Sequence, residues 1–421
     1  MRQLSLFPAL PRKVAILTPT QLKQEVKAFQ EFGKPTLIVP FPDTSLDLDL
    51  YVNEYWTSKQ RVAHSLHEIS YRACFKPQLP RFFIDRLSVS QSVVYDPFMG
   101  RGTTLIEAAL RGRIPFGADV NPLSRILIAP RLHPPTLTEI RDRLAQIDLS
   151  SETDIWDDLH VFFHPTTLRE ISSLRSYIMA KESVNELDYV DMWIRMVATN
   201  RLTGHSQGFL SVYTLPPNQT VSVESQRKIN EKRSQTPPIR DLREVIICKS
   251  KSLLRNLTRE DRSNLRRAEE RSQLVTGSSD STSHMKSASV DLVVTSPPFL
   301  DVVDYQSDNW LRCWFNGIDA ATVDIWQLSD PEEWRNRMIM VFTELHRLLV
   351  PGGYIAFEVG EVRGGKLLLE TLVVPAGREA NLTPIMILIN DQVFTKTSNC
   401  WGVKNLKKGT NTNRIVVFRK D

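Results

Sequence analysis

Short apolar runs alternate with amphipathic stretches in two separate parts of the chain. In the first part, SVVYDPF (92–98) is typical of a buried strand, TTLIEAALRG (103–112) of an amphipathic helix that ends at a glycine, and PFGADV (115–120) of a second strand. Such a strand–helix–strand unit is typical of a parallel sheet. We therefore predict an α/β fold for this part.

The same alternation returns after residue 275. SVDLVVTSPPF (289–299) predicts a strand and residues 331–349 a helix, and the runs PGGYIAFEVG (351–360), PIMILIN and NRIVVFRK predict three more strands. Between the two parts, residues 137–146, 166–181 and 186–203 have helical periodicity, and a turn-rich stretch and a basic region follow them. We predict one sheet domain, interrupted by a largely helical, basic insertion over 131–275.

Four segments follow from this pattern. They are an N-terminal extension (1–60) with one strand-like run, PTLIVPF, a first half of the sheet domain (61–130), the insertion (131–275) and a second half (276–421). Lysine and arginine residues between 225 and 275 fit either a polyanionic partner or the solvated face of a helix, and the pattern does not choose between these.

Composition narrows the class of protein. The chain has 421 residues, of which 41% are hydrophobic, and a formal net charge of +5. Its four cysteines are widely spaced, which argues against a disulfide framework and against a zinc site. We expect no metal. The sequence contains no apolar run of membrane-spanning length and no signal-peptide core, so we expect a cytoplasmic protein without a membrane partner.

The string DPFMGRGTT (96–104) lies where a strand passes into a helix. Gly100 and Gly102 allow a tight turn and a close approach of a ligand to the backbone. Asp119 ends the next strand, where an acidic side chain suits the two hydroxyls of a ribose. No GK[ST] follows, which excludes a phosphate loop, and the pattern GxGxxG is absent. A small adenosyl ligand therefore fits better than NAD.

A second candidate site is TSPPF (295–299), which follows a strand predicted to be buried. Two consecutive prolines cannot continue a strand ladder, and each fixes φ near about −65°. They would hold Ser296 and Phe299 rigidly at the strand end. One hydrogen-bonding group and one aromatic face suit a planar heterocycle with an amino substituent. A purely structural Pro-Pro turn is the alternative.

Together, DPFMGRGTT, ADVNP and TSPPF resemble the amino-methyltransferases of DNA, which make N4-methylcytosine and N6-methyladenine. The resemblance implies a Rossmann-like methyltransferase sheet with helices on both faces, the insertion as target-recognition region, and S-adenosylmethionine as cofactor. SLHEISYRACFKPQLP (65–80) resembles the segment that covers the methionine part of the cofactor, and Asp280 resembles the acidic position near its adenine. The implied cofactor-binding residues are Phe75, Asp96, Phe98, Gly100, Gly102, Thr103, Asp119 and Asp280, and the implied catalytic residues are Ser296, Pro297, Pro298 and Phe299.

A serine before the two prolines resembles the cytosine-N4 enzymes more than the adenine-N6 enzymes. The resemblance therefore implies methylation of cytosine N4 in a flipped-out base of double-stranded DNA, in a restriction–modification system with a cognate endonuclease as partner. Adenine-N6 methylation stays open, as does a DNA-binding protein with an inactive methyltransferase domain. An RNA or protein-glutamine methyltransferase fits less well. None of the four cysteines follows a proline, which disfavours cysteine attack on the ring.

Two features depart from the family pattern: Arg101 stands where a serine is common, and the cofactor loop precedes the catalytic loop by a long insertion. Other polar residues are candidate contacts with the base or with phosphates, and each has an ordinary structural alternative as a helix cap or solvated loop. They are Asp301, Asp304, Tyr305, His205, Ser206, Gln207, Lys396, Lys404, Lys407 and Lys408.

Overall fold

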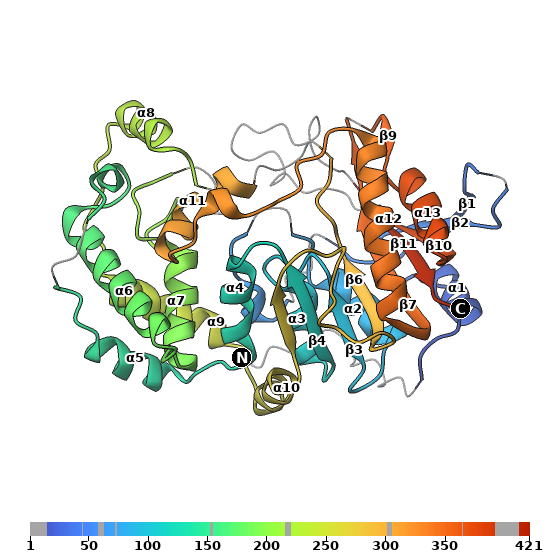
Figure 1. Cartoon of the computed structure of the whole chain (residues 1–421), viewed down its shortest axis with the longest axis horizontal. Helices are drawn as coiled ribbons and strands as arrows, with labels where there is room; N and C mark the ends of the chain where they lie inside the picture. The colour runs from blue at the N-terminus through green and yellow to red at the C-terminus, as the bar shows by residue number, and fades with distance from the viewer. Residues whose placement is uncertain are drawn as a thin grey trace.

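One large sheet runs through the computed structural model, with strand order β1-β2-β10-β11-β7-β6-β3-β4-β5 (Figure 1). The structure describes residues 15–43, 45–57, 63–71, 74–151, 155–214, 220–300, 305–363, 365–391 and 412–421. One side of the sheet, as far as its edge strand β5, is formed by β3 (Val93–Asp96), β4 (Ile114–Asp119), β5 (Gln273–Thr276), β6 (Val290–Thr295) and β7 (Leu349–Val359), and each neighbouring pair among them is parallel.

The sheet ends differently beyond β7. There, β11 (Asn413–Arg419) inserts antiparallel between β7 and β10 (Thr383–Asn390). The two motif-bearing strands are direct neighbours, since Val94 of β3 pairs with Leu292 of β6. Five parallel strands with connections on both faces form a Rossmann-like sheet, and the fold class predicted from the sequence is confirmed.

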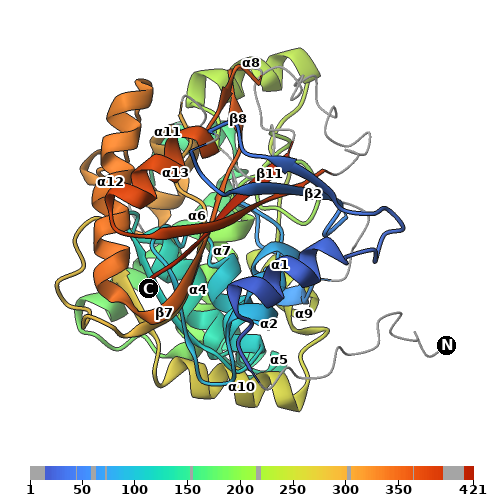
Figure 2. The ribbon, with the colours of Figure 1, turned by 90° about the vertical axis from the view of Figure 1, so that its right-hand side faces the viewer.

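Helices cover both faces because the strands are apolar on both sides. On one face, Tyr95, Val293 and Phe357 pack with α12 (Pro331–Leu348) and α13 (Glu370–Glu379). On the other, Val94 and Leu292 pack with α1 (Pro19–Lys27) and α2 (Gln78–Leu87). Figure 2 shows the two helix pairs on opposite sides of the strands.

The N-terminal residues belong to the sheet, which the boundary of the extension at residue 60 did not anticipate. The strands β1 (Leu37–Pro40) and β2 (Asp49–Asn53) form a hairpin, and β2 pairs in parallel with β10. The Asn390 side chain accepts from the backbone N–H of Tyr55 at 2.7 Å and fixes this junction. The strand-like run PTLIVPF does contain β1, and the run PIMILIN contains β10, but no local pattern shows that β10 pairs with β2.

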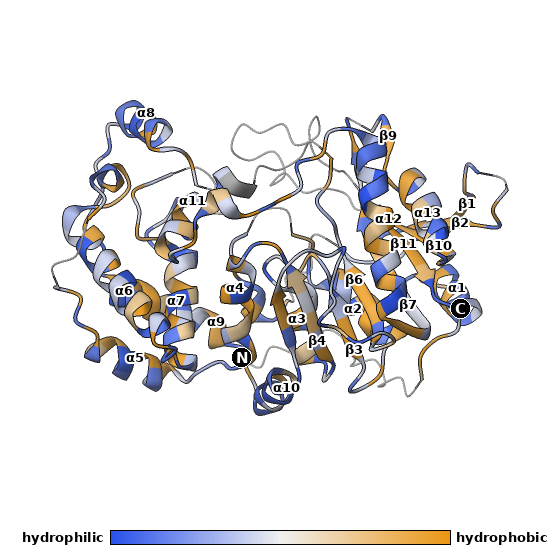
Figure 3. Cartoon of the chain, viewed as in Figure 1, coloured by the Kyte–Doolittle hydropathy of each residue, from blue (hydrophilic) through white to orange (hydrophobic). Residues whose placement is uncertain are grey.

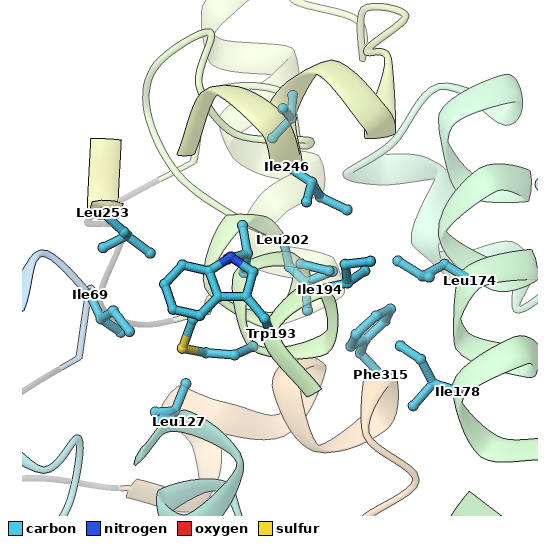
Figure 4. Close-up of a cluster of buried hydrophobic side chains, with 14 of the residues drawn as sticks. Ile69, Leu127, Leu174, Ile178, Trp193, Ile194, Leu202, Ile246, Leu253 and Phe315 are labelled. Carbon is cyan, nitrogen blue, oxygen red and sulfur yellow. The ribbon is translucent and has the colours of Figure 1, made fainter. Parts of the chain in front are cut away.

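A lobe of helices stands beside the sheet. It contains α5 (Leu137–Gln146), α6 (Pro165–Ser183), α7 (Tyr189–Arg201), α8 (Val223–Arg233) and α9 (Leu242–Leu254), together with α11 (Tyr305–Phe315) from the second half of the chain. Its core surrounds Trp193, whose side chain is fully buried and whose indole N–H donates to the Ser250 hydroxyl at 3.0 Å (Figure 4). We call these six helices the helical lobe.

The last part of the expected insertion packs on the sheet domain instead. Helix α10 (Arg259–Glu269) contacts α3 (Thr103–Leu110) and α4 (Leu123–Leu132), and β5 follows directly as a sheet strand. Figure 3 shows α8 and α10 as largely hydrophilic, at opposite ends of the molecule. No helix in the described part of the chain is both long enough and apolar enough to cross a membrane.

The remaining short elements are η1 (Ser65–His67), η2 (Asp157–Val161), η3 (Ala320–Thr322) and a two-stranded ribbon of β8 (Glu361–Val362) with β9 (Leu367–Leu368). In Figure 1, β9 lies on the side of the sheet where β7 ends, and α8 rises on the same side above the helical lobe. The carboxyl ends of the parallel strands therefore face the side of the molecule on which α8 and β9 lie.

Candidate functional site

A pocket that is open to solvent lies at the carboxyl ends of β3, β4 and β6. This edge is the one where doubly wound sheets bind ligands. The structure brings most of the predicted site residues together here. Those that line the pocket are Phe75, Asp96, Phe98, Gly100, Thr103, Asp119, Ser296 and Pro298.

The turn before α3 depends on its two glycines. Gly100 has φ +45° and Gly102 has φ +77°, a left-handed conformation that other residues rarely adopt. A Cβ atom on Gly102 would lie 2.4 Å from Cγ1 of Ile128, so α3 could not approach α4 as it does. Gly102 therefore allows α3 and α4 to pack closely behind the pocket, whereas Gly100 lines the pocket itself.

Asp119 lies at the end of β4, partly exposed to the pocket. One carboxylate oxygen accepts from the Gly100 N–H at 2.8 Å and the other from the Asn121 N–H at 2.9 Å. Burial raises the pKa of Asp119, and these two bonds oppose that rise. Because a carboxylate offers about four acceptor positions, Asp119 can still accept from two further donors.

Asp96 is more deeply buried, with 2% of its surface exposed. Its Oδ1 accepts from the Thr295 hydroxyl at 2.6 Å and from the Phe98 N–H at 3.1 Å. Burial raises the pKa of Asp96 to about 7. A cation in the pocket would favour the ionised form, since an opposite charge lowers the pKa of a carboxyl group.

The TSPPF loop leaves β6 in a fixed conformation. Pro297 is buried, and the carbonyl of Pro298 accepts from the indole N–H of Trp334 at 2.9 Å. Ser296 is half-buried and faces the pocket. Phe299, by contrast, is outside the pocket lining and packs against the core beneath α12. Of the four candidate catalytic residues, Ser296 and Pro298 line the pocket and Pro297 and Phe299 do not.

A residue that the sequence interpretation missed lies directly behind Ser296. Glu358 is in β7, beside β6, and only 4% of its surface is exposed. The Ser296 side chain lies close enough to this carboxyl group to lower its pKa, and Oε1 accepts from the Asn413 amide at 2.9 Å. Burial raises the pKa of Glu358 to about 7, and Glu361 adds to the rise. An acidic residue inside the apolar run YIAFEV was the available signal.

Asp280 does not line the pocket, although its neighbours Gly277 and Ser279 do. Its carboxylate accepts from the Ser278 hydroxyl at 2.6 Å and forms an ion pair with Arg337 at 3.1 Å. The Arg337 guanidinium lies 5.1 Å from the ring centre of Trp326, a second residue that the sequence interpretation missed. Trp326 lines the pocket and meets the Phe98 ring edge-on, with ring centres 6.0 Å apart.

Tyr71 and Cys74 complete the wall around Phe75. Burial raises the pKa of the Cys74 thiol, so this cysteine is a poor nucleophile at neutral pH. The loop residues His205, Ser206 and Gln207 do not line the pocket, and Ser206 and Gln207 are exposed. The remaining candidates lie outside the described residues; they are Asp301, Asp304, the Tyr305 side chain, Lys396, Lys404, Lys407 and Lys408.

Many basic residues of the insertion have structural partners. Arg243 donates to the carbonyls of Leu144 and Ile147, and Arg262 donates to that of Pro134. Helix α8 carries four exposed basic residues, of which Arg233 also stacks on the Tyr213 ring, and the helix lies on the side of the molecule toward which β7 runs (Figure 1). These residues are Arg227, Lys228, Lys232 and Arg233.

The pocket fits S-adenosylmethionine by the chemistry of its acceptors. The cofactor carries an ammonium group and two ribose hydroxyls, which are donors, and a sulfonium cation. Three aspartates, Asp96, Asp119 and Asp324, line the pocket together with aromatic rings. The left-handed Gly100 leaves one wall without a side chain. The predicted cofactor is therefore compatible with the residues present.

Comparison with known proteins agrees with this chemistry. Residues 15–124 match the family model described as DNA methylase, of the N6 and N4 type. A Type II methyltransferase, M.MvaI of Kocuria varians, is 25% identical over 152 residues, which are 35% of this chain and 30% of the relative. M.MjaII of Methanocaldococcus jannaschii, also a Type II methyltransferase, is 30% identical over 26% of this chain and 20% of the relative.

The chain therefore matches less than a third of the length of these curated relatives. Among solved structures, geranyl diphosphate C-methyltransferase of Streptomyces coelicolor A3(2) is similar over 81% of this chain and 75% of that chain, with 8% identity and a TM-score of 0.34. Over residues 15–124, where the sheet begins and the cofactor loop lies, the chain is similar to the DNA methylases that its motifs resemble.

Proposed function

We propose that the protein is a DNA methyltransferase that transfers a methyl group from S-adenosylmethionine to the exocyclic N4 of cytosine. The observation that carries the proposal is the Ser296–Glu358 pair at the edge of a pocket suited to that cofactor. The N-terminal half of the sheet domain would bind the cofactor, residues 276–421 would supply the catalytic loop, and the helical lobe would recognise the target sequence.

The cofactor half holds its ligand through carboxylates and a bare backbone. Asp119 accepts from the ribose hydroxyls, and Asp96 faces the ammonium group, which keeps its carboxyl group ionised. Phe75, Phe98 and Trp326 exclude water around the sulfonium end. Gly100, Gly102 and Thr103 shape the turn. Asp280 contributes indirectly, because its carboxylate holds Arg337 against Trp326.

Bound in this pocket, S-adenosylmethionine supplies an electrophilic methyl group, so the protein mainly has to align the amine with it. The Ser296 hydroxyl accepts a hydrogen bond from the target amine. As the methyl group attaches, the nitrogen becomes cationic and acidic. Ser296 then takes one proton from the nitrogen while its own proton passes to Glu358. A carboxyl pKa near 7 suits a group that accepts a proton near neutral pH.

The target nitrogen is buried in a duplex, so the base must leave the stack to reach Ser296. Phe299 lies next to the two prolines and is half-buried, and its side chain would have to leave its packing against the core to stack on the base. The exposed basic residues of α8 would contact phosphates on the same side of the molecule.

Adenine-N6 methylation is the second candidate, because the same acceptors serve that amine. Cytosine is favoured by the serine at position 296, which resembles the cytosine-N4 enzymes. The similarity to two Type II methyltransferases supports a role as the modification enzyme of a restriction–modification system, with an endonuclease of the same specificity as its counterpart.

Nucleoside mass spectrometry tests the proposal. Mixed-sequence DNA is incubated with the protein and S-adenosylmethionine, digested and analysed, with Ser296→Ala as the matched control. N4-methylcytosine from the wild type alone is the expected result. N6-methyladenine would retain the mechanism and overturn the target base. If neither product forms while S-adenosylhomocysteine binds, DNA amino-methylation is wrong and RNA becomes the next substrate to test.

A further inference from the structure

Five consecutive backbone carbonyls, those of residues 66–70, accept hydrogen bonds from side chains. This segment crosses between the cofactor loop and the helical lobe, and it includes the end of η1. Backbone carbonyls outside regular elements need partners when buried, but partners from five different elements or loops are unusual. The side-chain donors are Arg131 to Leu66, Arg101 to His67 and Ile69, Lys249 to Glu68, and Asn200 and Arg312 to Ser70.

These donors come from two sides. Arg101 belongs to the cofactor loop and Arg131 to α4, next to it; the Arg131 guanidinium also donates to the carbonyl of Arg101. Asn200, Lys249 and Arg312 belong to α7, α9 and α11 of the helical lobe. Segment 66–70 is therefore held between the two parts of the molecule, and each part fixes a different stretch of it.

The contact with Ser70 bears directly on the pocket. The Asn200 amide donates to the Ser70 carbonyl at 3.0 Å, and the Arg312 guanidinium donates to the same oxygen at 3.2 Å. The next residue is Tyr71, which lines the pocket. A Cβ on Gly100 would lie 3.7 Å from Cε1 of Tyr71, so this ring covers the cofactor loop where that loop has no side chain.

Both donors are buried inside the lobe: Asn200 is 3% exposed and Arg312 is 4% exposed. Arg312 also donates to the amide oxygen of Asn309 at 3.0 Å, and its guanidinium lies 5.9 Å from the Tyr71 ring centre. Burial lowers the pKa of Arg312. A cation is costly to bury, and Arg312 directs one of its donors at the carbonyl of the residue that precedes Tyr71.

We infer that Asn200 and Arg312 are positioning residues for the cofactor: through the Ser70 carbonyl they hold Tyr71 over the cofactor loop. The inference rests on the proposed function, since it assumes that the pocket binds S-adenosylmethionine. It makes the helical lobe part of the cofactor site, although neither donor touches the pocket. A movement of α7 or α11 would then change cofactor affinity.

The test measures the affinity for S-adenosylhomocysteine by calorimetry on the full chain without DNA. Loss of a buried donor is worth ~1–2 kcal/mol, so Asn200→Ala is expected to bind about tenfold more weakly. Arg312→Lys keeps a cationic donor and should retain most of the affinity that Arg312→Gln loses. The matched control is Gln226→Ala, because Gln226 is a fully buried amide of the same lobe that donates to the carbonyl of Tyr213 instead.

A double-mutant cycle separates positioning from general destabilisation. Tyr71→Ala should weaken binding by itself, and adding Asn200→Ala should then weaken it no further. Additive losses, or an Asn200→Ala affinity equal to that of the wild type, would overturn the inference. A wild-type chain that binds no S-adenosylhomocysteine would instead overturn the proposed function. Melting temperatures identify any variant that fails to fold. If Arg312→Gln fails to fold, Tyr71→Ala still tests the inference.

Discussion

The Thr295 hydroxyl donates a hydrogen bond to Oδ1 of Asp96 at 2.6 Å and joins the two loops of the site. The two residues end neighbouring strands, and both are almost completely buried. This bond lowers the pKa of Asp96, against the larger effect of burial. The TSPPF loop and the turn that follows β3 therefore share one buried carboxyl group.

We expect Thr295→Val to weaken cofactor binding and to make it more sensitive to pH. In the wild type, affinity should rise as Asp96 ionises, near pH 7. Without the hydroxyl, the pKa of Asp96 rises further, so the midpoint moves to higher pH. The midpoint is measured by calorimetric titration with S-adenosylhomocysteine at pH values from about 5.5 to 8.5, a range that includes the expected ionisation of Asp96. If the midpoint did not move, the ionisation of Asp96 would not control cofactor binding.

Glu358→Gln should lower the rate of methyl transfer by about 10²–10⁴, the usual contribution of a positioned base. Affinity for the cofactor should stay close to that of the wild type, since Glu358 does not line the pocket. In the wild type the rate should rise with pH through the pKa of Glu358, about 7, because the carboxylate is the form that accepts the proton. Single-turnover rates over this pH range measure both effects.

The neighbouring carboxylate provides a sharper control. Glu361 raises the pKa of Glu358, so Glu361→Gln should shift the pH–rate midpoint downward. Glu361 contacts Thr412 and Arg414 rather than Ser296. If Glu361→Gln left the midpoint in place while Glu358→Gln abolished the rate, the titrating group would lie elsewhere.

Substitutions of Asp119 and Asp280 should differ clearly in how much they weaken the binding of S-adenosylhomocysteine. Asp119→Ala removes a carboxylate that faces the pocket and should weaken S-adenosylhomocysteine binding about 10- to 100-fold, as expected for hydrogen bonds to a charged group. Asp280→Asn changes a carboxylate bound to Arg337 and Ser278 and should cost less than about threefold, because an amide oxygen can still accept from either partner. Equal losses in the two variants would place Asp280 on the ligand.

Removal of positive charge from α8 should weaken DNA binding and reduce its dependence on salt. The change is Arg227, Lys228 and Lys232 to glutamine, all of them exposed. Each lost phosphate contact lowers the slope of log affinity against log salt by about one. The control removes the same charge from α10, at Arg259, Arg266 and Arg267, on the opposite end of the molecule (Figure 1). A comparable loss in both variants would leave α8 without a special role.

The fold and the tight turn before α3 could be predicted from the sequence because both depend on local patterns. Strand periodicity and the Gly100–Gly102 turn can be read without knowing which strands are neighbours. Glu358 and Trp326 could not be found in that way. Glu358 meets Ser296 only because β7 lies beside β6, and Trp326 reaches the pocket from the segment between α11 and α12. The hairpin β1–β2 was missed for the same reason, since its partner β10 lies far along the chain.

Five of the six helices of the helical lobe lie in the connection between β4 and β5, two strands that pair directly, with Phe116 opposite Gln273. The sheet register therefore does not depend on the length or the sequence of the lobe. In evolutionary terms, the helices between β4 and β5 could be replaced by others while the sheet and the pocket at its edge are kept. A different lobe would still need side-chain donors for the carbonyls of Glu68 and Ser70. We therefore expect less freedom to change the donor positions, Asn200 and Lys249, than other positions of the lobe.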